Sequence, residues 1–310
     1  MTNPKRIQMA SSGSGGGGGF AGMGDRGIYC GGDDRNTMDY ITISSAGNAT
    51  DFGDLSRAPN GATNVSNGTR MCNAGGYAPA VSGYTNTIDY FTFASPGNST
   101  DFGDLTAAHG NHANISGDTR GIFMGNTRGA GSEYANIDYI TIASTGDASD
   151  FGDTTQARYS TAGVWSATRG VSCGGTTGGG SSLDTMDYIT VASTGDATDF
   201  GNLGDATFAA GGSSNLIRGV IGGGNSITTN IRYITIASTG NSTDFGDLTD
   251  GRQELGSTSN ATRAVWGGGF ASVPVRSNIL DYITIATTGN ALDFGDLTEA
   301  KYTGSGASGI

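Results

Sequence analysis

Pairs of aspartates three residues apart are the side chains in this sequence that could most directly do chemistry. The pairs lie at equivalent points of a repeated segment: Asp51 with Asp54, Asp101 with Asp104, Asp150 with Asp153, and Asp244 with Asp247. Two carboxylates at this spacing could bind Ca²⁺, or could serve as the acid and the base of glycoside hydrolysis. An enzyme needs one such site, whereas these pairs recur in most repeats. The repetition therefore favours a structural role, in which the aspartates cap turns by hydrogen bonding to backbone N–H groups.

Two histidines, His109 and His112, form a second arrangement that could do chemistry. A His-x-x-His pair can ligate a metal ion, but no third ligand has an evident place in the sequence. No Ser-His-Asp arrangement is suggested and no Gly-x-Ser-x-Gly motif stands out, which argues against a nucleophilic hydrolase. We therefore expect both histidines in a surface loop, and we predict no catalytic residue, no metal site and no cofactor.

Three cysteines, Cys30, Cys72 and Cys173, do not form a disulfide framework. Cys30 and Cys173 fall at the same position of two different repeats, which would hold them far apart. We expect all three to be small buried apolar residues.

The net charge and the apolar content exclude several classes of partner. The chain of 310 residues has a formal net charge of −12, from 28 acidic and 16 basic residues. Such a charge repels phosphate backbones, so we expect no nucleic-acid partner. No apolar run is long enough to span a bilayer, which predicts no membrane insertion. Residues 7–10 give way to serine and glycine, and this is not the apolar core of a secretory signal.

The candidate residues belong to a segment that is repeated six times, as in residues 138–153 (DYITIASTGDASDFGD). Each copy contains a Tyr, and a Phe follows it 12 residues later. The six pairs are Tyr40 and Phe52, Tyr90 and Phe102, Tyr139 and Phe151, Tyr188 and Phe200, Tyr233 and Phe245, and Tyr282 and Phe294. Successive Tyr residues are 50, 49, 49, 45 and 49 residues apart. A fixed spacing inside a slightly variable period indicates a hairpin joined by loops of variable length, and such periods are typical of propeller blades.

Each repeat divides into four strand-like segments, A to D, of which A is expected nearest the axis. Segment B begins at an Arg: Arg26, Arg70, Arg120, Arg169, Arg218 or Arg263. Segment C is the alternating Tyr-Ile-Thr-Ile strand, and a Gly-Asn or Gly-Asp turn leads to segment D with its Phe. Segment A follows about seven residues after the Phe and has small residues in its middle, as expected of strands that converge on one axis.

The segment-B Arg is expected to pair with the Asp that precedes the segment-C Tyr, because B and C should be antiparallel neighbours. Repeat five argues that this pair is not required, since Arg232 replaces the Asp there while Arg218 remains.

The two ends of the chain predict a closed ring. Residues 301–310 supply a segment A without the rest of its sheet, and residues 25–55 lack a segment A. Joining them completes a blade and removes an exposed edge. We therefore predict an all-β, six-bladed propeller of four-stranded antiparallel blades, closed by the C-terminal strand joining the N-terminal blade. Its repeats lie near residues 25–69, 70–119, 120–168, 169–217, 218–262 and 263–310, after a Gly-rich linker at residues 1–24.

The order of motifs in each repeat resembles the kelch propeller repeat. The motifs in one copy are Ala157-Arg158, Gly174-Gly175, Asp187-Tyr188 and Phe200. The sequence departs from kelch in having Phe where Trp is usual and Asp before the Tyr instead of after it. The position of Arg158 is also variable, and is occupied elsewhere by Pro59, His109, Thr207 or Lys301. The resemblance implies a kelch-like fold more than a function.

Two longer runs resemble structural proteins of tailed bacteriophages, particularly those of marine bacteria and cyanobacteria. They are YITIASTGNSTDFGDLT at residues 233–249 and KRIQMASSGSGGGG at residues 5–18. The resemblance implies a virion protein assembled in the host cytoplasm, at the tail, a fibre or another exterior position. Residues 1–10 would then dock onto other virion proteins, with Lys5, Arg6, Ile7 and Met9 as the candidate anchor.

Sequence variation concentrates in the connections between segments B and C. Residues 74–87, 125–136, 174–186 and 267–279 differ in length and content, whereas the C–D turns barely change. Variable loops on a rigid scaffold usually carry recognition. Tyr77, Tyr84, Tyr134 and Phe270 provide aromatic surface there, which suits stacking on sugars or packing against protein. We predict that they recognise a host-surface glycan or protein.

The leading hypothesis is therefore a virion structural protein that is anchored by its N-terminal peptide. Its variable loops would face a host receptor or a neighbouring subunit. The first alternative is a kelch-type adaptor that binds a protein partner in the host cell. The second is a glycan-active enzyme that uses loop carboxylates.

Overall fold

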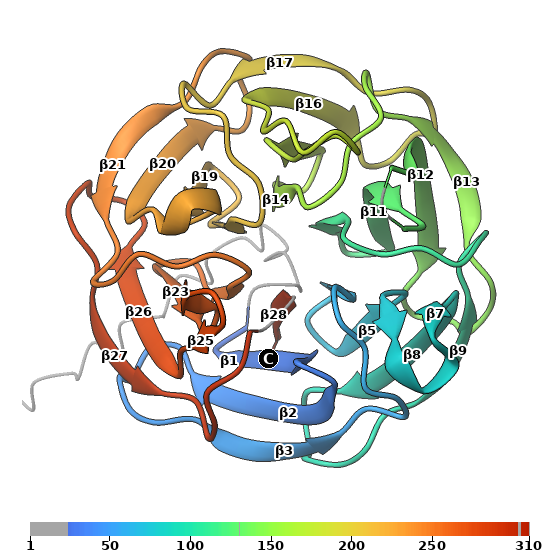
Figure 1. Ribbon diagram of the computed structural model, residues 1–310, viewed down its shortest axis with the longest axis horizontal. Helices are drawn as coiled ribbons and strands as arrows, with labels where there is room; N and C mark the ends of the chain where they lie inside the picture. Colours follow the sequence, from blue (N-terminus) through green and yellow to red (C-terminus); the bar gives the residue numbers. More distant parts are fainter. Residues whose placement is uncertain (1–23, 130, 303–304, 310) are drawn as a thin grey trace, which may run out of the picture.

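The computed structural model describes residues 24–129, 131–302 and 305–309, which form a ring of six four-stranded antiparallel sheets (Figure 1). The predicted six-bladed β-propeller is confirmed. Two short 3₁₀ helices, η1 (Pro79–Val81) and η2 (Asn225–Ile227), are the helical elements of the described residues.

Each blade runs from an inner strand A through B and C to an outer strand D. From blade one to blade six, the A strands are β28 (Ser305–Gly309), β4 (Thr63–Ser66), β10 (Ala113–Ser116), β14 (Ala162–Trp165), β18 (Gly211–Ser214) and β22 (Gly256–Ser259). The B strands are β1 (Arg26–Gly32), β5 (Arg70–Ala74), β11 (Arg120–Thr127), β15 (Arg169–Cys173), β19 (Arg218–Gly222) and β23 (Arg263–Gly267). The C strands are β2 (Arg35–Thr42), β8 (Thr87–Thr92), β12 (Glu133–Thr141), β16 (Thr185–Thr190), β20 (Asn230–Thr235) and β26 (Ile279–Thr284). The D strands are β3 (Thr50–Asp54), β9 (Thr100–Asp104), β13 (Ser149–Asp153), β17 (Thr198–Asn202), β21 (Thr243–Asp247) and β27 (Leu292–Asp296).

Blade one closes the ring as predicted. Its inner strand β28 pairs antiparallel with β1, so that Ala307 lies opposite Ile28 and Gly309 opposite Arg26. The strand nearest the axis therefore comes from the C-terminal end of the described chain, while its three partners come from the N-terminal end (Figure 1).

The inner strands have small residues because their backbones lie close together. A Cβ added at Gly163 would lie 2.1 Å from the carbonyl oxygen of Asn114, and one at Gly212 would lie 2.4 Å from that of Gly163. Serine hydroxyls also link the strands, as where Ser66 Oγ donates to the carbonyl of Ser308 at 2.8 Å. Larger side chains would force these strands apart.

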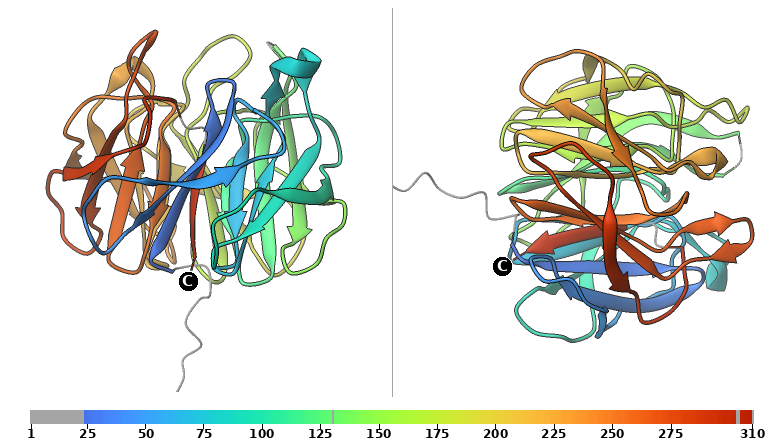
Figure 2. Two further views of the ribbon diagram at one scale, coloured as in Figure 1. Left: turned by 90° about the horizontal axis from the view of Figure 1, so that it is seen from below. Right: turned by 90° about the vertical axis from the view of Figure 1, so that its left-hand side faces the viewer.

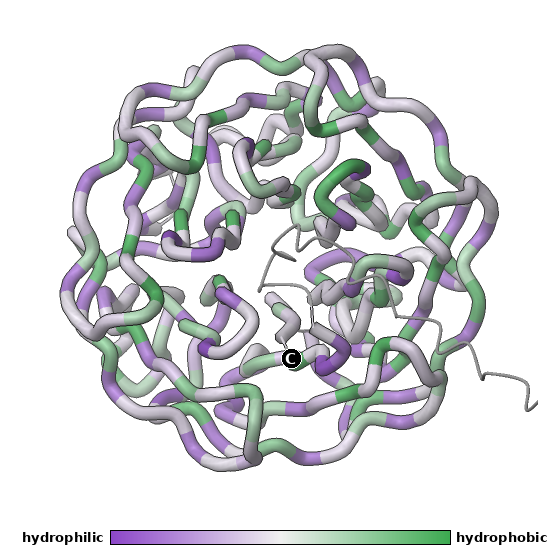
Figure 3. Tube along the Cα trace, turned by 180° about the vertical axis from the view of Figure 1, so that it is seen from behind, coloured by the Kyte–Doolittle hydropathy of each residue, from purple (hydrophilic) through white to green (hydrophobic). Residues whose placement is uncertain are grey.

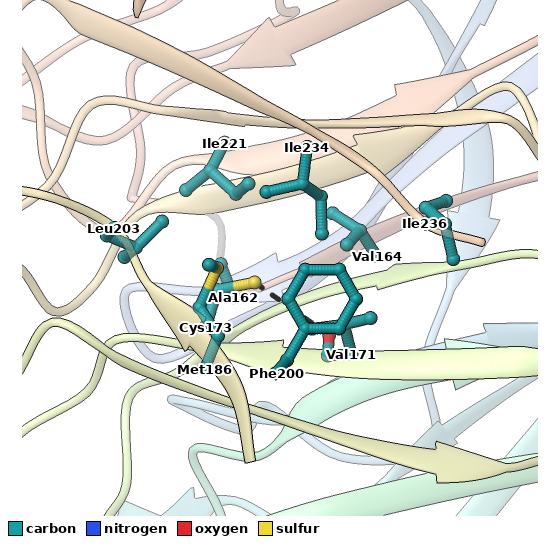
Figure 4. Close-up of a cluster of buried hydrophobic side chains, with 10 residues drawn as sticks. All are labelled: Ala162, Val164, Val171, Cys173, Met186, Phe200, Leu203, Ile221, Ile234 and Ile236. Carbon is teal, nitrogen blue, oxygen red and sulfur yellow. Dashed lines mark hydrogen bonds between the residues drawn. The ribbon is translucent and has the colours of Figure 1, made fainter. Parts of the chain in front are cut away.

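The hydrophobic core consists of clusters between adjacent blades. Figure 4 shows the cluster between blades four and five, where Phe200 lies near Val171 and Ile234. In the same blade the Phe200 ring packs edge-on against Tyr188, with 6.1 Å between ring centroids. Burial of each such Phe stabilises the fold by about 1.5–3 kcal/mol, so the six repeated Phe side chains contribute a large part of the stability of the propeller.

The Arg that begins each B strand does not pair with the Asp before the Tyr, and that prediction is wrong. Arg169 lies over the ring of Tyr188 at 4.2 Å, and its Nη1 donates to the carbonyl of Ile236 in the next blade at 3.0 Å. Arg169 faces Thr190 in the strand register, whereas Asp187 faces Ser172 further along the strand. The same two contacts recur for Arg26, Arg70, Arg120, Arg218 and Arg263.

The C–D turn of each blade binds the outer strand of the preceding blade. Gly97 N donates to the carbonyl of Phe52 at 2.8 Å, and Asn98 Oδ1 accepts from Asp54 N at 3.1 Å. A Cβ at Gly53 would lie 2.5 Å from the carbonyl oxygen of Gly97, which explains the Gly that follows each Phe. The capping oxygen therefore belongs to the turn residue of the next blade and not to the paired aspartates, which corrects the predicted role of those aspartates.

The ring has two different faces (Figure 2). The B–C and D–A connections lie at one face, together with the small hairpins β6 (Tyr77–Ala78) with β7 (Gly83–Tyr84) and β24 (Phe270–Ser272) with β25 (Val275–Arg276). The A–B and C–D turns lie at the opposite face. In Figure 3, apolar and polar stretches alternate around the ring. The A and B strands are buried along almost their whole length, as expected of sheets that pack between two neighbouring blades.

Candidate functional site

The face with the B–C and D–A connections, which we call the variable face, has a cavity of about 410 Å³ at the axis of the ring. We call it the axial cavity. Its walls come from the D–A connections and from two B–C connections. The wall residues with aromatic or polar side chains include Asn60, Tyr77, Tyr84, Asn111, Tyr159, Phe208, Glu254 and Tyr302.

Two of the four predicted recognition residues line the axial cavity. Tyr77 and Tyr84 are paired across the β6–β7 hairpin, which brings their rings into an edge-on contact at 5.8 Å. Tyr77 is 38% exposed. The hairpin therefore presents one tyrosine of the pair to solvent at the rim of the cavity.

The other two predicted residues lie outside the cavity wall. Phe270 stacks on Tyr302 with 4.9 Å between centroids, and Tyr302 lines the cavity. Phe270 therefore packs against a wall residue without lining the cavity itself. Tyr134 lies beneath the guanidinium of Arg128 at 4.1 Å, in another B–C connection. The structure thus brings Tyr77 and Tyr84 together, holds Phe270 one layer back and leaves Tyr134 separate.

Three aromatic wall residues were not predicted. Tyr159, Phe208 and Tyr302 lie in D–A connections, each eight residues after the Phe of its repeat. That constant spacing is the sequence signal that could have found them. The prediction considered only the B–C connections, because these vary most in length, whereas the cavity wall also draws on the D–A connections.

A belt of backbone hydrogen bonds holds the rim of the cavity. Ser160 N donates to the carbonyl of Asn111 at 2.8 Å, and Ala209 N donates to that of Ser160 at 2.9 Å. The residues of the belt, each nine after its Phe, have φ between +55° and +65°: Gly61, Asn111, Ser160, Ala209 and Glu254. Left-handed backbone costs energy in residues other than Gly, and strain of this kind clusters at binding sites. The belt fixes the wall in one shape.

Glu254 gives the cavity wall its acidic side chain. Burial raises the pKa of this carboxyl group above its ordinary value. Burial, followed by the negative charge of Glu254, also raises the pKa of Tyr302. The wall thus combines aromatic faces with one carboxyl group and several amide and hydroxyl groups, which is suited to a neutral or cationic ligand with a flat apolar face.

The two histidines lie beneath the axial cavity, so their predicted place in a surface loop is wrong. His109 is 0% and His112 is 6% exposed. His112 and Thr63 line the cavity floor. Thr63 Oγ1 lies 3.2 Å from His112 Nδ1, and His112 Nε2 lies 2.6 Å from His109 Nδ1. His109 Nε2 lies 3.1 Å from Asp138 Oδ2, which completes a buried chain of four side chains.

The carboxylate of Asp138 fixes one end of this chain. A carboxylate accepts, so His109 Nε2 carries a proton and donates to Asp138 Oδ2. Burial, and then the charge of His109, hold the pKa of His112 well below its ordinary value. Burial alone would raise the pKa of Asp138, but the hydrogen bonds from His109 and Thr106 lower it overall.

His109 occupies a position that is cationic in three of the other five repeats, as Arg158, Arg252 and Lys301. We call the residue seven positions after each Phe the slot residue. In five blades a side chain from the D–A connection, usually the slot residue, reaches the strand-C Asp of the following blade. The pairs are Lys301 with Asp39, Arg57 with Asp89, His109 with Asp138, Arg158 with Asp187, and Arg252 with Asp281. The partner of each strand-C Asp is therefore the D–A cation and not the Arg of strand B.

Three further features of the described residues bear on function, namely possible metal ligands, helices and thiols. No group of three or more His, Cys, Asp or Glu side chains within residues 24–129, 131–302 and 305–309 could hold a metal ion. Over the same residues, no helix is both long enough and apolar enough to cross a membrane. All three cysteines are buried and unpaired, as predicted, and burial raises the pKa of Cys173 to about 12. The candidate anchor residues Lys5, Arg6, Ile7 and Met9 lie outside the described residues.

Comparison with known proteins assigns this chain to no family. No protein-family profile matches it, and no curated protein matches it. The kelch and bacteriophage resemblances therefore rest on the sequence motifs alone.

Proposed function

We propose that this protein is a structural component of a bacteriophage virion, at the tail, a fibre or another exterior position. Its propeller would serve as a binding scaffold and not as an enzyme. The variable face, with the axial cavity at its centre, would contact a host-surface glycan or protein, or a neighbouring subunit of the particle.

The observation that carries the binding role is the segregation of constant and variable parts. The strands, the C–D turns and the inter-blade hydrogen bonds repeat around the ring, and they give a rigid frame. The aromatic residues Tyr77, Tyr84, Tyr159 and Tyr302 gather at one cavity on the variable face. Aromatic side chains exposed at a preformed cavity are typical of recognition sites for sugars and proteins.

The direction of the chain supports attachment through the N-terminal segment. Strand β1 begins at Arg26, beside the A–B end of blade one, and runs toward the variable face. Gly24 and Asp25 therefore lie at the face opposite the axial cavity. A segment that is joined there can hold the ring on a particle while the cavity points outward.

The virion role is tested by locating the protein in purified particles. We expect the full chain to co-purify with virions, and a chain lacking residues 1–24 to fold but to be absent from them. Recovery with a host protein and not with particles would support the kelch-type adaptor instead. Equal incorporation of the two chains would reject the anchor.

The recognition role has a separate test in host adsorption. We expect Tyr77→Ala and Tyr159→Ala to reduce adsorption of assembled particles, since both remove an aromatic ring from the cavity wall. Tyr134→Ala is the matched control, because Tyr134 is as exposed as Tyr77 but lies away from the cavity. Equal adsorption of all variants would reject the cavity as the recognition site.

A further inference from the structure

One junction of the ring departs from the pattern of a D–A cation that binds a strand-C carboxylate. At the entrance to blade five the slot residue is Thr207, and the strand-C position is occupied by Arg232. Asp205, two residues before the slot, accepts a hydrogen bond from Arg232. The ion pair between connection and strand is therefore kept, but its two charges have changed places.

The exchange moves the ion pair toward solvent and leaves a cavity behind it. The side chains of Arg158 and Asp187 are both 0% exposed, whereas those of Arg232 and Asp205 are 23% and 56% exposed. A cavity of about 160 Å³ lies at this junction, which we call the blade-five cavity. Thr207 lies in its wall, and the buried Thr207 Oγ1 has no hydrogen-bond partner among the described residues.

The wall contains backbone acceptors that bind a guanidinium at the neighbouring junction. Arg252 Nη1 donates to the carbonyls of Gly268 at 2.9 Å and Ile279 at 2.7 Å. Gly223 and Asn230 have the corresponding positions in blade five, and both line the cavity. The Asn230 carbonyl accepts from Gly223 N at 3.0 Å, just as the Ile279 carbonyl accepts from Gly268 N at 3.1 Å, so the Gly223 and Asn230 carbonyls can both accept from a ligand.

The charges of the wall compensate each other, which favours a neutral group. Arg232 and Asp205 form an ion pair, so neither charge is left over to bind an ion. The groups that a ligand can contact include the Gly223 and Asn230 carbonyls, the Thr207 hydroxyl and the N–H groups of Arg232. A planar amide matches this set, since its N–H donates to the Gly223 carbonyl and its oxygen accepts from the hydroxyl or the guanidinium.

The apolar part of the wall selects among amides. Leu203 and Ile221 line the cavity beside the polar groups. They suit a methyl group attached to the amide carbon. An acetamido group has that methyl group, whereas the side-chain amide of Gln or Asn has none.

We propose that the blade-five cavity is a binding site for the acetamido group of an N-acetylated sugar. The site is separate from the axial cavity, and it does not depend on the proposed virion role. Its ligand is a terminal or exposed N-acetylhexosamine, recognised by the Gly223 carbonyl, the Thr207 hydroxyl and Arg232.

The test is a nuclear magnetic resonance titration of the full-length, isotope-labelled chain with N-acetylglucosamine. The amide signals of Gly223 and Asn230 should shift with saturation in the millimolar range. Glucose, which lacks the acetamido group, and glucosamine, which is cationic, should leave the same signals in place. Unmoved signals with N-acetylglucosamine, or equal shifts with glucose, would overturn the proposal.

Two variants connect the response to this cavity. The double variant Thr207→Arg with Arg232→Asp installs the pair that Arg252 and Asp281 form, so it fills the cavity and should bind at least about tenfold more weakly. Thr207→Val keeps the shape of the wall and removes the hydroxyl, which should weaken binding by about threefold to tenfold. Unchanged binding in both variants would show that the sugar binds elsewhere and would overturn the proposal. A stronger response to glutamine than to the sugar would identify a protein side chain as the occupant and overturn the sugar proposal.

Discussion

Arg158 Nη1 lies 2.7 Å from Asp187 Oδ2, and neither side chain is exposed to solvent. Arg158 belongs to the D–A connection and Asp187 to β16, so the pair fixes a loop of the variable face to the strand beneath it. Five blades contain a pair of this kind, and these pairs form a buried polar layer under the variable face.

Removal of one partner of this pair should be strongly destabilising. Arg158→Leu leaves the Asp187 carboxylate buried without its cation, which costs about 3–5 kcal/mol in the free energy of unfolding. Arg232→Leu is the matched control, because its partner Asp205 is exposed and such pairs contribute about 0.2–1 kcal/mol. Chemical denaturation of both variants measures the difference, and equal losses would contradict the role of burial.

The inter-blade contact of Gly152 can be separated from its backbone strain. Gly152 and Gly195 both have left-handed φ, at +145° and +149°, so Ala at either position costs about 1–3 kcal/mol. A Cβ at Gly152 would lie 2.6 Å from the Gly195 carbonyl oxygen, whereas one at Gly195 meets nothing within 4 Å. Gly152→Ala should therefore lose a further 1–3 kcal/mol, roughly the cost of overpacking. Equal free energies of unfolding for the two variants would show that the turn moves freely.

The histidines beneath the axial cavity should make stability depend on pH. The pKa of His112 is lowered in the folded protein, so the unfolded chain binds more protons below its ordinary pKa of about 6.5. Stability is therefore complete above about pH 6.5 and is lost as the pH falls below it. The lowered pKa of Asp138 acts in the same direction at lower pH. Denaturation midpoints measured between about pH 7 and pH 5 should decrease.

A double variant isolates this contribution to the pH dependence. His109→Arg with His112→Thr reproduces the equivalent positions of the next repeat, Arg158 and Thr161. We expect the decrease between neutral and mildly acidic pH to become smaller in this variant, because neither new residue titrates in that range. An unchanged slope would assign the pH dependence to other groups.

Strand β28 should be required for cooperative unfolding of the ring. Removal of residues 305–310 deletes the inner strand of blade one and exposes the edge of β1. Loss of the buried Ala307 and of the pairing with Ile28 should lower Tm by roughly 10 °C or more. Addition of a peptide of residues 301–310 should restore part of that loss. Thermal unfolding at a single, unchanged Tm without the peptide would contradict closure by this strand.

The repeat itself made the fold predictable. The spacing of 12 residues between Tyr139 and Phe151 is the same in all six copies, which indicated a hairpin. The small residues of the inner strands indicated convergence on an axis. The two ends, each with an incomplete blade, then indicated closure of the ring. The candidate site was less predictable because its residues come from different blades and are brought together only by the closed ring. Tyr77 and Tyr84 are close in sequence and were found, whereas Tyr159 and Tyr302 lie far apart in sequence and line the same cavity only because the ring closes.

The buried charges show a second limit of reasoning from neighbouring strands. Adjacency of strands B and C suggested a pair between Arg169 and Asp187, but a side chain one connection away, Arg158, takes that place. The useful signal was the joint change at Thr207 and Arg232, where cation and carboxylate are lost together. The burial of His109 follows from the same comparison, since three of its equivalents, Arg158, Arg252 and Lys301, are buried cations.

The position of β28 has a consequence for synthesis on the ribosome. Residues 305–309 leave the exit tunnel after every other strand of the ring, although their partner β1 is the first strand to be synthesised. Strand β1 therefore lacks its inner neighbour during the synthesis of all the other strands. Blade one remains a three-stranded sheet with an unpaired edge until residues 305–309 emerge and join it. Stalled or prematurely terminated products therefore expose that edge to other nascent chains and to proteases.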